Sequence, residues 1–280
     1  MTAASPLVTT DWLDREHGEP DLKIVDAPFY LPGDARTPEG VYAAAHIPGS
    51  ALFDLSLIAD PYTDLPHMIA GPQAFAEAVG ALGIGDGDRV VVYDHLGLMS
   101  AARVWWNFRL MGLDEVYVLD GGLPAWIAEG LPVDRGSPPD EAPRTFTPRP
   151  RPQLLRNMSQ VRQALADGVQ VLDARSAGRF SGAEPEPRPG LSSGHMPGAR
   201  NLPFNAIARD GRLLPPDALR QVFEGAGVDP GRPIIATCGS GVTAAVLALG
   251  LARLGHWDTP VYDGAWSEWA SRPGNPILKD

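Results

Sequence analysis

A single cysteine, Cys238, is the residue with the most evident capacity for covalent chemistry in this chain. It follows the apolar run "PIIAT" and precedes "GSGVTAAVLALGLARLG", in which a glycine-rich turn leads into a helical stretch. Inward-pointing N–H groups of such a turn, reinforced by the N-terminus of the helix, form a cradle for an anion. A cradle of this kind favours the reactive thiolate. The alternative is an inert cysteine at the end of a core strand, because free cysteines are commonly buried.

The loop after Cys238 is predicted to bind the anion through its backbone. Gly239 and Gly241 allow the chain to bend sharply and leave N–H groups uncovered. The Ser240 hydroxyl is placed to hydrogen-bond the substrate or the departing sulfur, although a small residue also suits a tight turn. We therefore expect catalytic roles for Cys238 and Ser240, and substrate contacts from Gly239, Gly241, Val242 and Thr243.

The elements that must position this loop follow an alternating pattern. Short runs such as "IVDA", "VVVYD" and "VYVLDGG", and later "VQVLDA", "PIIATC" and "TPVYDG", are typical of buried parallel strands. Stretches such as "GPQAFAEAVGALGI" and "SAARVWWNFRLMG" indicate helices, each closed by a glycine. The pattern predicts α/β architecture. Sites in such sheets lie at the carboxyl ends of the strands, where Cys238 falls.

The two halves of the chain repeat each other. "HIPG" in the first half corresponds to "HMPG" in the second, and "LDGGLPAW" corresponds to "YDGAWSEW". Four pairs recur in the same order at nearly constant separation, namely Asp26 and Asp173, His46 and His195, Asp94 and Cys238, and Trp126 and Trp269. Such order predicts two related domains.

Only the second half keeps the cysteine. Its counterpart Asp94 stands in "YDHLGLMSAA", where the short glycine loop is lost. Between the halves, "DRGSPPDEAPRTFTPRPRPQ" has the composition of a linker. We predict a non-catalytic N-terminal domain over residues 1–135, a linker over 136–152 and a catalytic C-terminal domain over 153–280.

The motif "CGSGVTA" resembles the active loop of the 3-mercaptopyruvate sulfurtransferases, a family of the two-domain rhodanese superfamily. The resemblance extends over "GHMPGARNLPF", "SAARVWWNFRLMG", "LDGGLPAW" and "GRFSGAEPEPRPG", and so over essentially the whole chain. It implies two tandem rhodanese-like domains, each a small parallel sheet with helices on both faces. The thiosulfate-using relatives carry a basic residue in the loop, which is uncharged here.

The resemblance also implies the residues that bind the donor. The planar fork of arginine matches a carboxylate. Of the arginines in "DARSAGRFSGAEPEPRPG", the family pattern selects Arg179 and Arg188 as the substrate clamp, whereas a solvated surface charge is the ordinary role of a loop arginine. Arg175, two residues after Asp173, is expected to form a structural ion pair.

A histidine of the N-terminal half completes the implied site. In "LPHM" it is His67, which would shuttle a proton during catalysis. The family often has an acid after "FFDI", but "LFDLS" has Ser56 there. This departure puts a strict serine–histidine–acid relay in doubt, and Asp60 or Asp64 are the candidate substitutes.

Other conspicuous residues are expected to be structural. His46 and His195 occur in both halves, including the one without the cysteine, and therefore suggest a shared role in the turn or core. The tryptophans are expected to pack the core, namely Trp105, Trp106, Trp126, Trp266 and Trp269.

Composition narrows the classes of function. The net charge of −11 disfavours binding to nucleic acid or to an anionic membrane. One cysteine excludes an intrachain disulfide and a cysteine-based zinc site, and the histidines lack metal-ligand spacing, so no metal or organic cofactor is expected. Without a secretory pattern at the N-terminus or a stretch long enough to span a bilayer, a cytoplasmic location is the expectation.

These features together predict an enzyme that moves sulfur from 3-mercaptopyruvate through a Cys238 persulfide to a thiol or cyanide, and so releases pyruvate. The acceptor thiol would be a protein such as thioredoxin or a low-molecular-weight thiol. A thiosulfate sulfurtransferase is the nearest alternative, and a non-enzymatic rhodanese-like binding module is the alternative from another class. Phosphoryl chemistry is disfavoured, because "CGSGVTAAV" has no arginine and is short for a phosphate loop.

Overall fold

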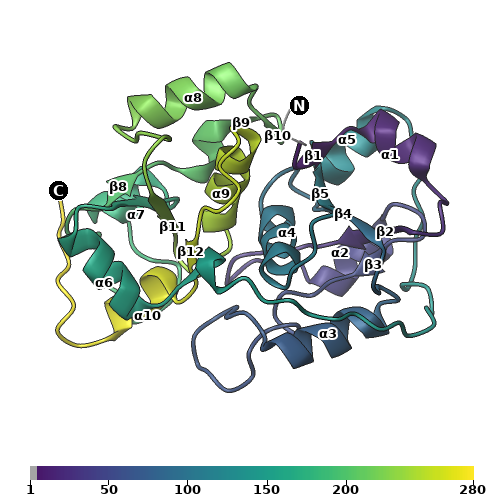
Figure 1. The fold of residues 1–280 in the computed structure, drawn as a ribbon, viewed down its shortest axis with the longest axis horizontal. Coiled ribbons are helices and arrows are strands. Elements are labelled where there is room, and N and C mark those ends of the chain that lie inside the picture. The colour runs from purple at the N-terminus through teal and green to yellow at the C-terminus, as the bar shows by residue number, and fades with distance from the viewer. Residues whose placement is uncertain (1–4) are drawn as a thin grey trace. The chain divides into compact units, whose positions relative to one another are not determined.

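The computed structural model describes residues 5–280, which divide into two compact units. The first unit comprises the described residues up to Pro61, together with Ile69–Arg151 and Asp210–Leu213. The second comprises Tyr62–Met68, Pro152–Arg209 and Leu214–Asp280. Each unit has its own parallel sheet flanked by helices (Figure 1), which confirms the predicted α/β class.

The sheet of the first unit has the strand order β1-β5-β4-β2-β3, and all its pairings are parallel. Its strands are β1 (Leu7–Val8), β2 (Leu22–Asp26), β3 (Ala51–Leu52), β4 (Arg89–Tyr93) and β5 (Val116–Leu119), and β10 (Arg212–Leu213) also belongs to this unit. Its helices are α1 (Thr10–Glu16), α2 (Pro38–Ala44), α3 (Pro72–Ala81), α4 (Ser100–Leu110) and α5 (Gly122–Ala128).

The sheet of the second unit has the order β6-β12-β11-β7-β8, again with parallel pairings. Its strands are β6 (Leu155–Arg156), β7 (Gln170–Asp173), β8 (Arg200–Asn201), β11 (Ile234–Thr237) and β12 (Val261–Tyr262), and β9 (Ala208–Arg209) also belongs to this unit. The helices are η1 (Pro152–Leu154), α6 (Met158–Ala166), α7 (Ala177–Ser181), η2 (Phe204–Ile207), α8 (Pro216–Gly225), α9 (Ala244–Arg253) and α10 (Ala265–Ser271).

The two sheets have one topology, which confirms the internal repeat. β4 and β11 are the central strands, each flanked by the strand that ends in the paired aspartates, Asp26 on β2 and Asp173 on β7. The loop after the central strand therefore leaves the carboxyl edge of the sheet at the same place in both units. That loop begins with Asp94 in the first unit and with Cys238 in the second.

The helix after the central strand is buried in both units. Every residue of α4 is buried, and so is every residue of α9 before Arg253. A helix that packs apolar groups on all sides belongs to the core rather than to the surface. The N-terminus of α9 is consequently held rigidly beside the end of β11, where the cysteine loop must start and end.

The tryptophans pack as predicted. All five that the sequence singled out are buried, and the indole N–H groups of several donate to backbone carbonyls. Trp105 donates to Val116 at 3.1 Å, and Trp126 donates to Pro132 at 2.7 Å. Buried indoles need such partners, so these residues are anchored as well as buried.

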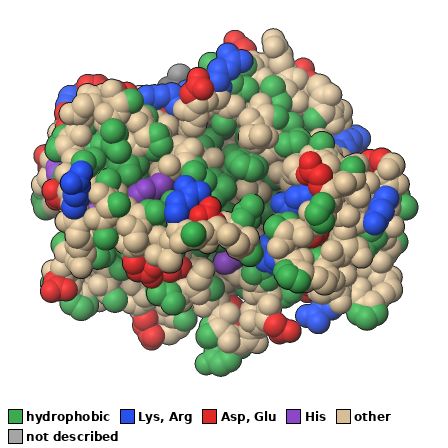
Figure 2. Space-filling view, turned by 180° about the vertical axis from the view of Figure 1, so that it is seen from behind, with side chains coloured by type: hydrophobic (Ala, Val, Ile, Leu, Met, Phe, Trp, Pro, Cys, Tyr) green, Lys and Arg blue, Asp and Glu red, His purple; other side chains and the backbone are tan. Residues whose placement is uncertain are grey.

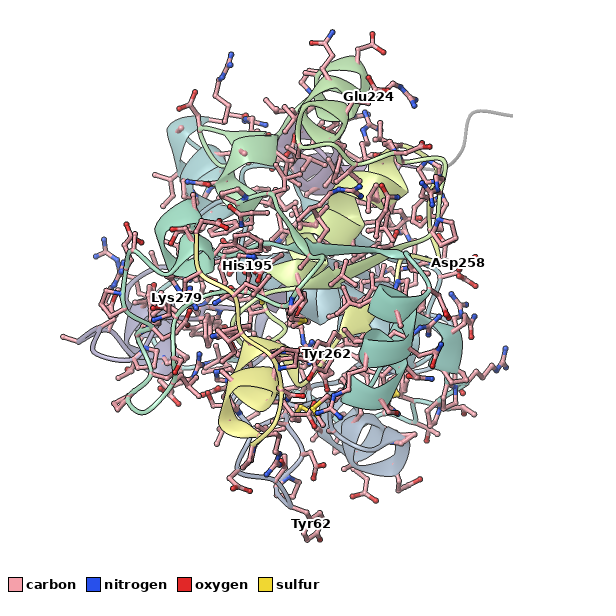
Figure 3. All side chains as sticks on the ribbon, turned by 90° about the vertical axis from the view of Figure 1, so that its left-hand side faces the viewer. Tyr62, His195, Glu224, Asp258, Tyr262 and Lys279 are labelled. Atoms are coloured by element: carbon pink, nitrogen blue, oxygen red, sulfur yellow. The ribbon has the colours of Figure 1, made fainter. Side chains whose placement is uncertain are left out.

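His46 and His195 have the structural role that the repeat suggested. Nδ1 of His46 donates to the carbonyl of Tyr42 at 2.9 Å, and its ring stacks on the Tyr42 ring. His195 does the same with Phe180, at 3.0 Å. The backbone of His195 also pairs with Leu278, so the C-terminal segment runs past it, and Figure 3 shows His195 near Lys279.

Within residues 5–280, no helix is long and apolar enough to cross a membrane. On the face shown in Figure 2, acidic and basic side chains are interspersed with apolar ones.

Candidate active site

Cys238 lies at the end of β11, and its side chain is almost fully buried. The loop Cys238–Thr243 connects it to α9, and Gly241 adopts a φ of +80°, which side chains rarely tolerate. The carbonyl of Cys238 accepts a hydrogen bond from the N–H of Trp266 at 2.9 Å. The carbonyl of Gly239 accepts from the N–H and the hydroxyl of Ser267, at 3.0 and 2.7 Å.

These two carbonyls determine where the N–H groups of the loop point. In a trans peptide, the N–H and the carbonyl point in opposite directions. Since the carbonyls of Cys238 and Gly239 point at the start of α10, the N–H groups of Gly239 and Ser240 point away from it. The loop therefore presents donors on one side, as an anion cradle requires.

Arg179 on α7 lies against this loop. A Cβ atom added to Gly239 would come within 2.7 Å of Arg179 Nη2, so the guanidinium would have to shift to admit a side chain there. The Nε and Nη2 atoms of Arg179 donate to the two carboxylate oxygens of Glu186, at 3.2 and 2.5 Å. This bidentate pair fixes one edge of the guanidinium and leaves Nη1 outside the pair with Glu186.

Arg188 is half-buried and lies within electrostatic range of both Cys238 and Arg179. Burial lowers the pKa of Arg188 below its ordinary value, and the positive charge of Arg179 lowers it further. The negative charge of a Cys238 thiolate acts in the opposite direction. The two arginines and the thiol thus act on one another electrostatically. The structure therefore brings together the three residues that the sequence assigned to the nucleophile and the clamp.

His67 belongs to the segment Tyr62–Met68 of the second unit and contacts Arg188. The two side chains meet at 3.2 Å, between Arg188 Nη2 and His67 Nε2. Arginine has no acceptor, so His67 Nε2 accepts this hydrogen bond and the ring carries its proton on Nδ1. His67 also has a positive φ of 58°, an uncommon conformation that here directs its ring at the arginine.

Arg175 forms the structural ion pair that was expected. Its guanidinium is buried, contacts Asp173 at 2.7 Å and lies 4.2 Å from the centre of the Trp266 ring. It also contacts Glu186 at 2.7 Å. Glu186 therefore joins Arg175 to Arg179, a role that sequence reasoning missed. An acidic residue within an arginine-rich loop was the signal available for it.

The remaining predicted residues lie in both units. Ser240 and Val242 are buried within it, and Thr243 immediately precedes α9. Ser56 is exposed in the first unit, where its N–H donates to Asp54 at 2.6 Å. Of the two candidate acids, Asp64 is exposed and lies in the same segment as His67, while Asp60 lies in the first unit.

The corresponding loop of the first unit corrects one expectation. The cradle is not lost there, because the carboxylate of Asp94 accepts from the N–H groups of Leu96, Met99 and Ala101 at 2.7 to 3.0 Å. Gly97 has a φ of +95°, and its counterpart Gly241 in the second unit also has a positive φ, of +80°. The loop has thus kept its form and holds its own carboxylate where an external anion would bind.

Within the described part of the chain, no group of three or more histidine, cysteine or acidic side chains is placed to hold a metal ion. The described site contains one thiol, backbone donors, two arginines and a histidine.

Comparison with known proteins gives the same two-part division. A model of the rhodanese-like domain matches residues 9–129 and 157–272. The thiosulfate/3-mercaptopyruvate sulfurtransferase 1 of Arabidopsis thaliana, a mitochondrial protein, is 44% identical over 99% of this chain and 79% of its own length. The 3-mercaptopyruvate sulfurtransferase of Escherichia coli K12 is 40% identical over 96% of each chain. The crystal structure of SseA from Escherichia coli superposes with a TM-score of 0.87 and 37% identity, over 95% of this chain and 100% of its own.

Proposed function

The chain belongs to the family of rhodanese-like proteins, as its motifs predicted, and on that premise we propose that it is a 3-mercaptopyruvate sulfurtransferase with Cys238 as its nucleophile. We assign the sulfur-transfer site to the second unit because Arg179 and Arg188 both act on its cysteine loop. The first unit has a carboxylate at the same position. A non-enzymatic binding module would require neither a thiol nor paired arginines there.

In the first half-reaction, the Cys238 thiolate attacks the sulfur of 3-mercaptopyruvate. A sulfur–sulfur bond forms, and the electron pair of the breaking carbon–sulfur bond passes to carbon as the enolate of pyruvate. Protonation of this enolate gives pyruvate, and the enzyme carries a persulfide on Cys238. The loop N–H groups stabilise negative charge on this sulfur throughout.

In the second half-reaction, a thiolate or cyanide attacks the outer sulfur of the persulfide. The sulfur–sulfur bond breaks, its electrons return to Cys238, and the thiolate is regenerated. The reaction is covalent catalysis in two steps. The acceptor is a thiol, of a protein such as thioredoxin or of a small molecule, or cyanide.

The arginines take unequal parts in binding the donor. The Nε and Nη2 atoms of Arg179 donate to Glu186, so Nη1 is the atom of Arg179 that can donate to the substrate. Arg188 contacts only the neutral His67 through Nη2, so it supplies the main charge-assisted hydrogen bonds to the substrate carboxylate. When Arg188 turns to the carboxylate, Nε2 of His67 is released. His67 Nε2 can then accept the proton that the transferred sulfur carried as a thiol and deliver it to the enolate carbon, which balances the half-reaction.

The decisive experiment is intact-mass spectrometry of the protein after incubation with 3-mercaptopyruvate. The wild type should gain one sulfur atom and release pyruvate, and cyanide should remove that sulfur. Cys238→Ser removes the only thiol and should gain none, while its circular dichroism spectrum stays that of the wild type. Sulfur transfer by the Cys238→Ser variant would refute the mechanism.

A further inference from the structure

Glu186 is the acidic side chain at the centre of the arginine cluster. Its side chain is only 2% exposed, and it contacts Arg175 at 2.7 Å and Arg179 at 2.5 Å. A buried carboxylate is costly unless it is paired, and here both of its oxygens are engaged. Glu186 is therefore the acidic partner shared by Arg175 and Arg179.

The charges of this cluster cancel in pairs. Asp173 and Glu186 are matched by Arg175 and Arg179, which they contact directly. Arg188 contacts a neutral imidazole instead of a carboxylate. Of the two arginines that face the cysteine loop, only Arg179 is thus in direct contact with a carboxylate.

The other charged groups nearby do not add a cation. Ser240 and its neighbours in the loop are uncharged, and Asp263, buried at the end of β12, is acidic. Glu186 also acts on Arg188 electrostatically. Arg188 is consequently the arginine beside the loop whose charge is not paired directly with a carboxylate and is offered to the donor.

We propose that Glu186 is a positioning and specificity-determining residue that limits the sulfur donor to a single negative charge. It holds the Arg179 guanidinium over Gly239 and at the same time neutralises it. A monoanionic 3-mercaptopyruvate is matched by Arg188. A dianion such as thiosulfate brings a second charge that meets the field of the Glu186 carboxylate in a poorly solvated site. This inference rests on the proposed sulfur transfer.

The direct test compares two donors on one variant. Glu186→Gln keeps a side chain of the same size and removes the charge. We expect the ratio of kcat/KM for thiosulfate to kcat/KM for 3-mercaptopyruvate to rise about tenfold or more. Because the ratio is measured on one protein preparation, a partial loss of folded enzyme affects both donors equally. An unchanged ratio would overturn the proposal.

Glu184→Gln is the matched control. Glu184 lies in the same loop but is exposed and contacts Ser176 rather than an arginine. This variant removes the same charge from the loop and should leave the donor ratio within about twofold of the wild type, because exposed charges are screened. An equal rise in both variants would mean that net charge, and not the buried pairing of Glu186, sets the preference.

A measurement on the wild type keeps the proposal testable even where Glu186→Gln does not fold. Pyruvate and oxalate are similar in size but carry one and two negative charges. We expect pyruvate to protect Cys238 from alkylation by iodoacetamide at lower concentration than oxalate does. Protection by oxalate that equals or exceeds that by pyruvate would overturn the single-charge limit. A wild type that accepts sulfur from neither donor would instead refute the proposed function, and the protection assay would still test the charge limit.

Discussion

At the scale of single residues, the two arginines proposed to bind the donor are each held by a specific side-chain partner. Glu186 fixes one edge of Arg179, and His67 accepts from Arg188. Arg179, whose rotamer is fixed in this way, is expected to bind substrate without a further entropic cost of ordering, whereas Arg188 must leave His67 to do so. Because Arg179 contacts a carboxylate and Arg188 contacts an imidazole, we expect their removal to affect activity and stability differently.

Arg188→Ala should lower kcat/KM for 3-mercaptopyruvate by about ten- to a hundredfold, because a charge-assisted hydrogen bond contributes about 1.5–3 kcal/mol. It should change the melting temperature little, since Arg188 leaves no buried carboxylate behind. Arg179→Ala should also reduce activity severely, but it leaves Glu186 with one arginine fewer in a buried cluster, and so should lower the melting temperature as well.

Steady-state kinetics and thermal melts on both arginine variants separate these roles. Arg220→Ala, on the exposed side of α8, controls for the general loss of a positive charge. Near-normal activity in both variants, set against the control, would contradict the arginine clamp.

At the scale of elements, the cysteine loop depends on α10 as much as on β11 and α9. The N–H groups at the start of α10 hold the loop carbonyls, and Ala265 adopts a φ of +52° at that start. The matching glycine of the first unit, Gly122, has a φ of +55°, and the following residue, Leu123, donates to the carbonyl of Asp94 at 3.0 Å. An uncommon backbone conformation retained at both positions indicates that it aims these donors at the loop.

Gly239→Ala tests how closely the loop and α7 must approach. The added methyl would lie 2.7 Å from Arg179 Nη2, below any normal contact, so the guanidinium must move and weaken its pair with Glu186. We expect kcat/KM for 3-mercaptopyruvate to fall about tenfold or more, with the fold retained. Gly225→Ala is the control, since its methyl would meet nothing within 4 Å. Equal kinetics in the two variants would argue against this close approach.

The sequence predicted the elements that depend on local pattern. β2, β4, β7 and β11 each contain a short apolar run, and buried parallel strands have that composition. The pairing of Glu186 with two arginines depends instead on how "AEPEPRPG" folds back onto α7, which no periodicity encodes. The membership of His67 in the second unit likewise follows from long-range packing rather than from its place in the chain.

At the scale of the whole molecule, one fold occurs twice, and the loop after its central strand begins with Asp94 in the first unit and with Cys238 in the second. The sequence predicted the repeat, but it could not show that Asp94 fills the cradle, because hydrogen bonds from Met99 and Ala101 depend on the exact path of the loop. The predicted inactivity of the first unit then has a narrower reason than a missing cradle: among its described residues, Asp94 stands where the second unit has its thiol.

The contributions of the thiol and of the arginine pair can be separated by one substitution. Asp94→Cys in the Cys238→Ser background makes the introduced thiol the only one in the chain. The N–H groups that now bind the Asp94 carboxylate should stabilise its thiolate, so the thiolate absorbance should titrate below the ordinary cysteine pKa of about 8.5.

The same double variant should nevertheless gain no sulfur from 3-mercaptopyruvate. Near Asp94 the first unit has the pair of His95 and the buried Asp26, at 2.8 Å, which offers no net positive charge to a donor carboxylate. Arg36 is exposed and already paired with Asp34. Intact mass after incubation with the donor measures the outcome, and Cys238→Ser alone is the control. A persulfide on the introduced thiol would show that the cradle suffices without the arginines, whereas a thiol that titrates normally would show that the cradle does not stabilise a thiolate.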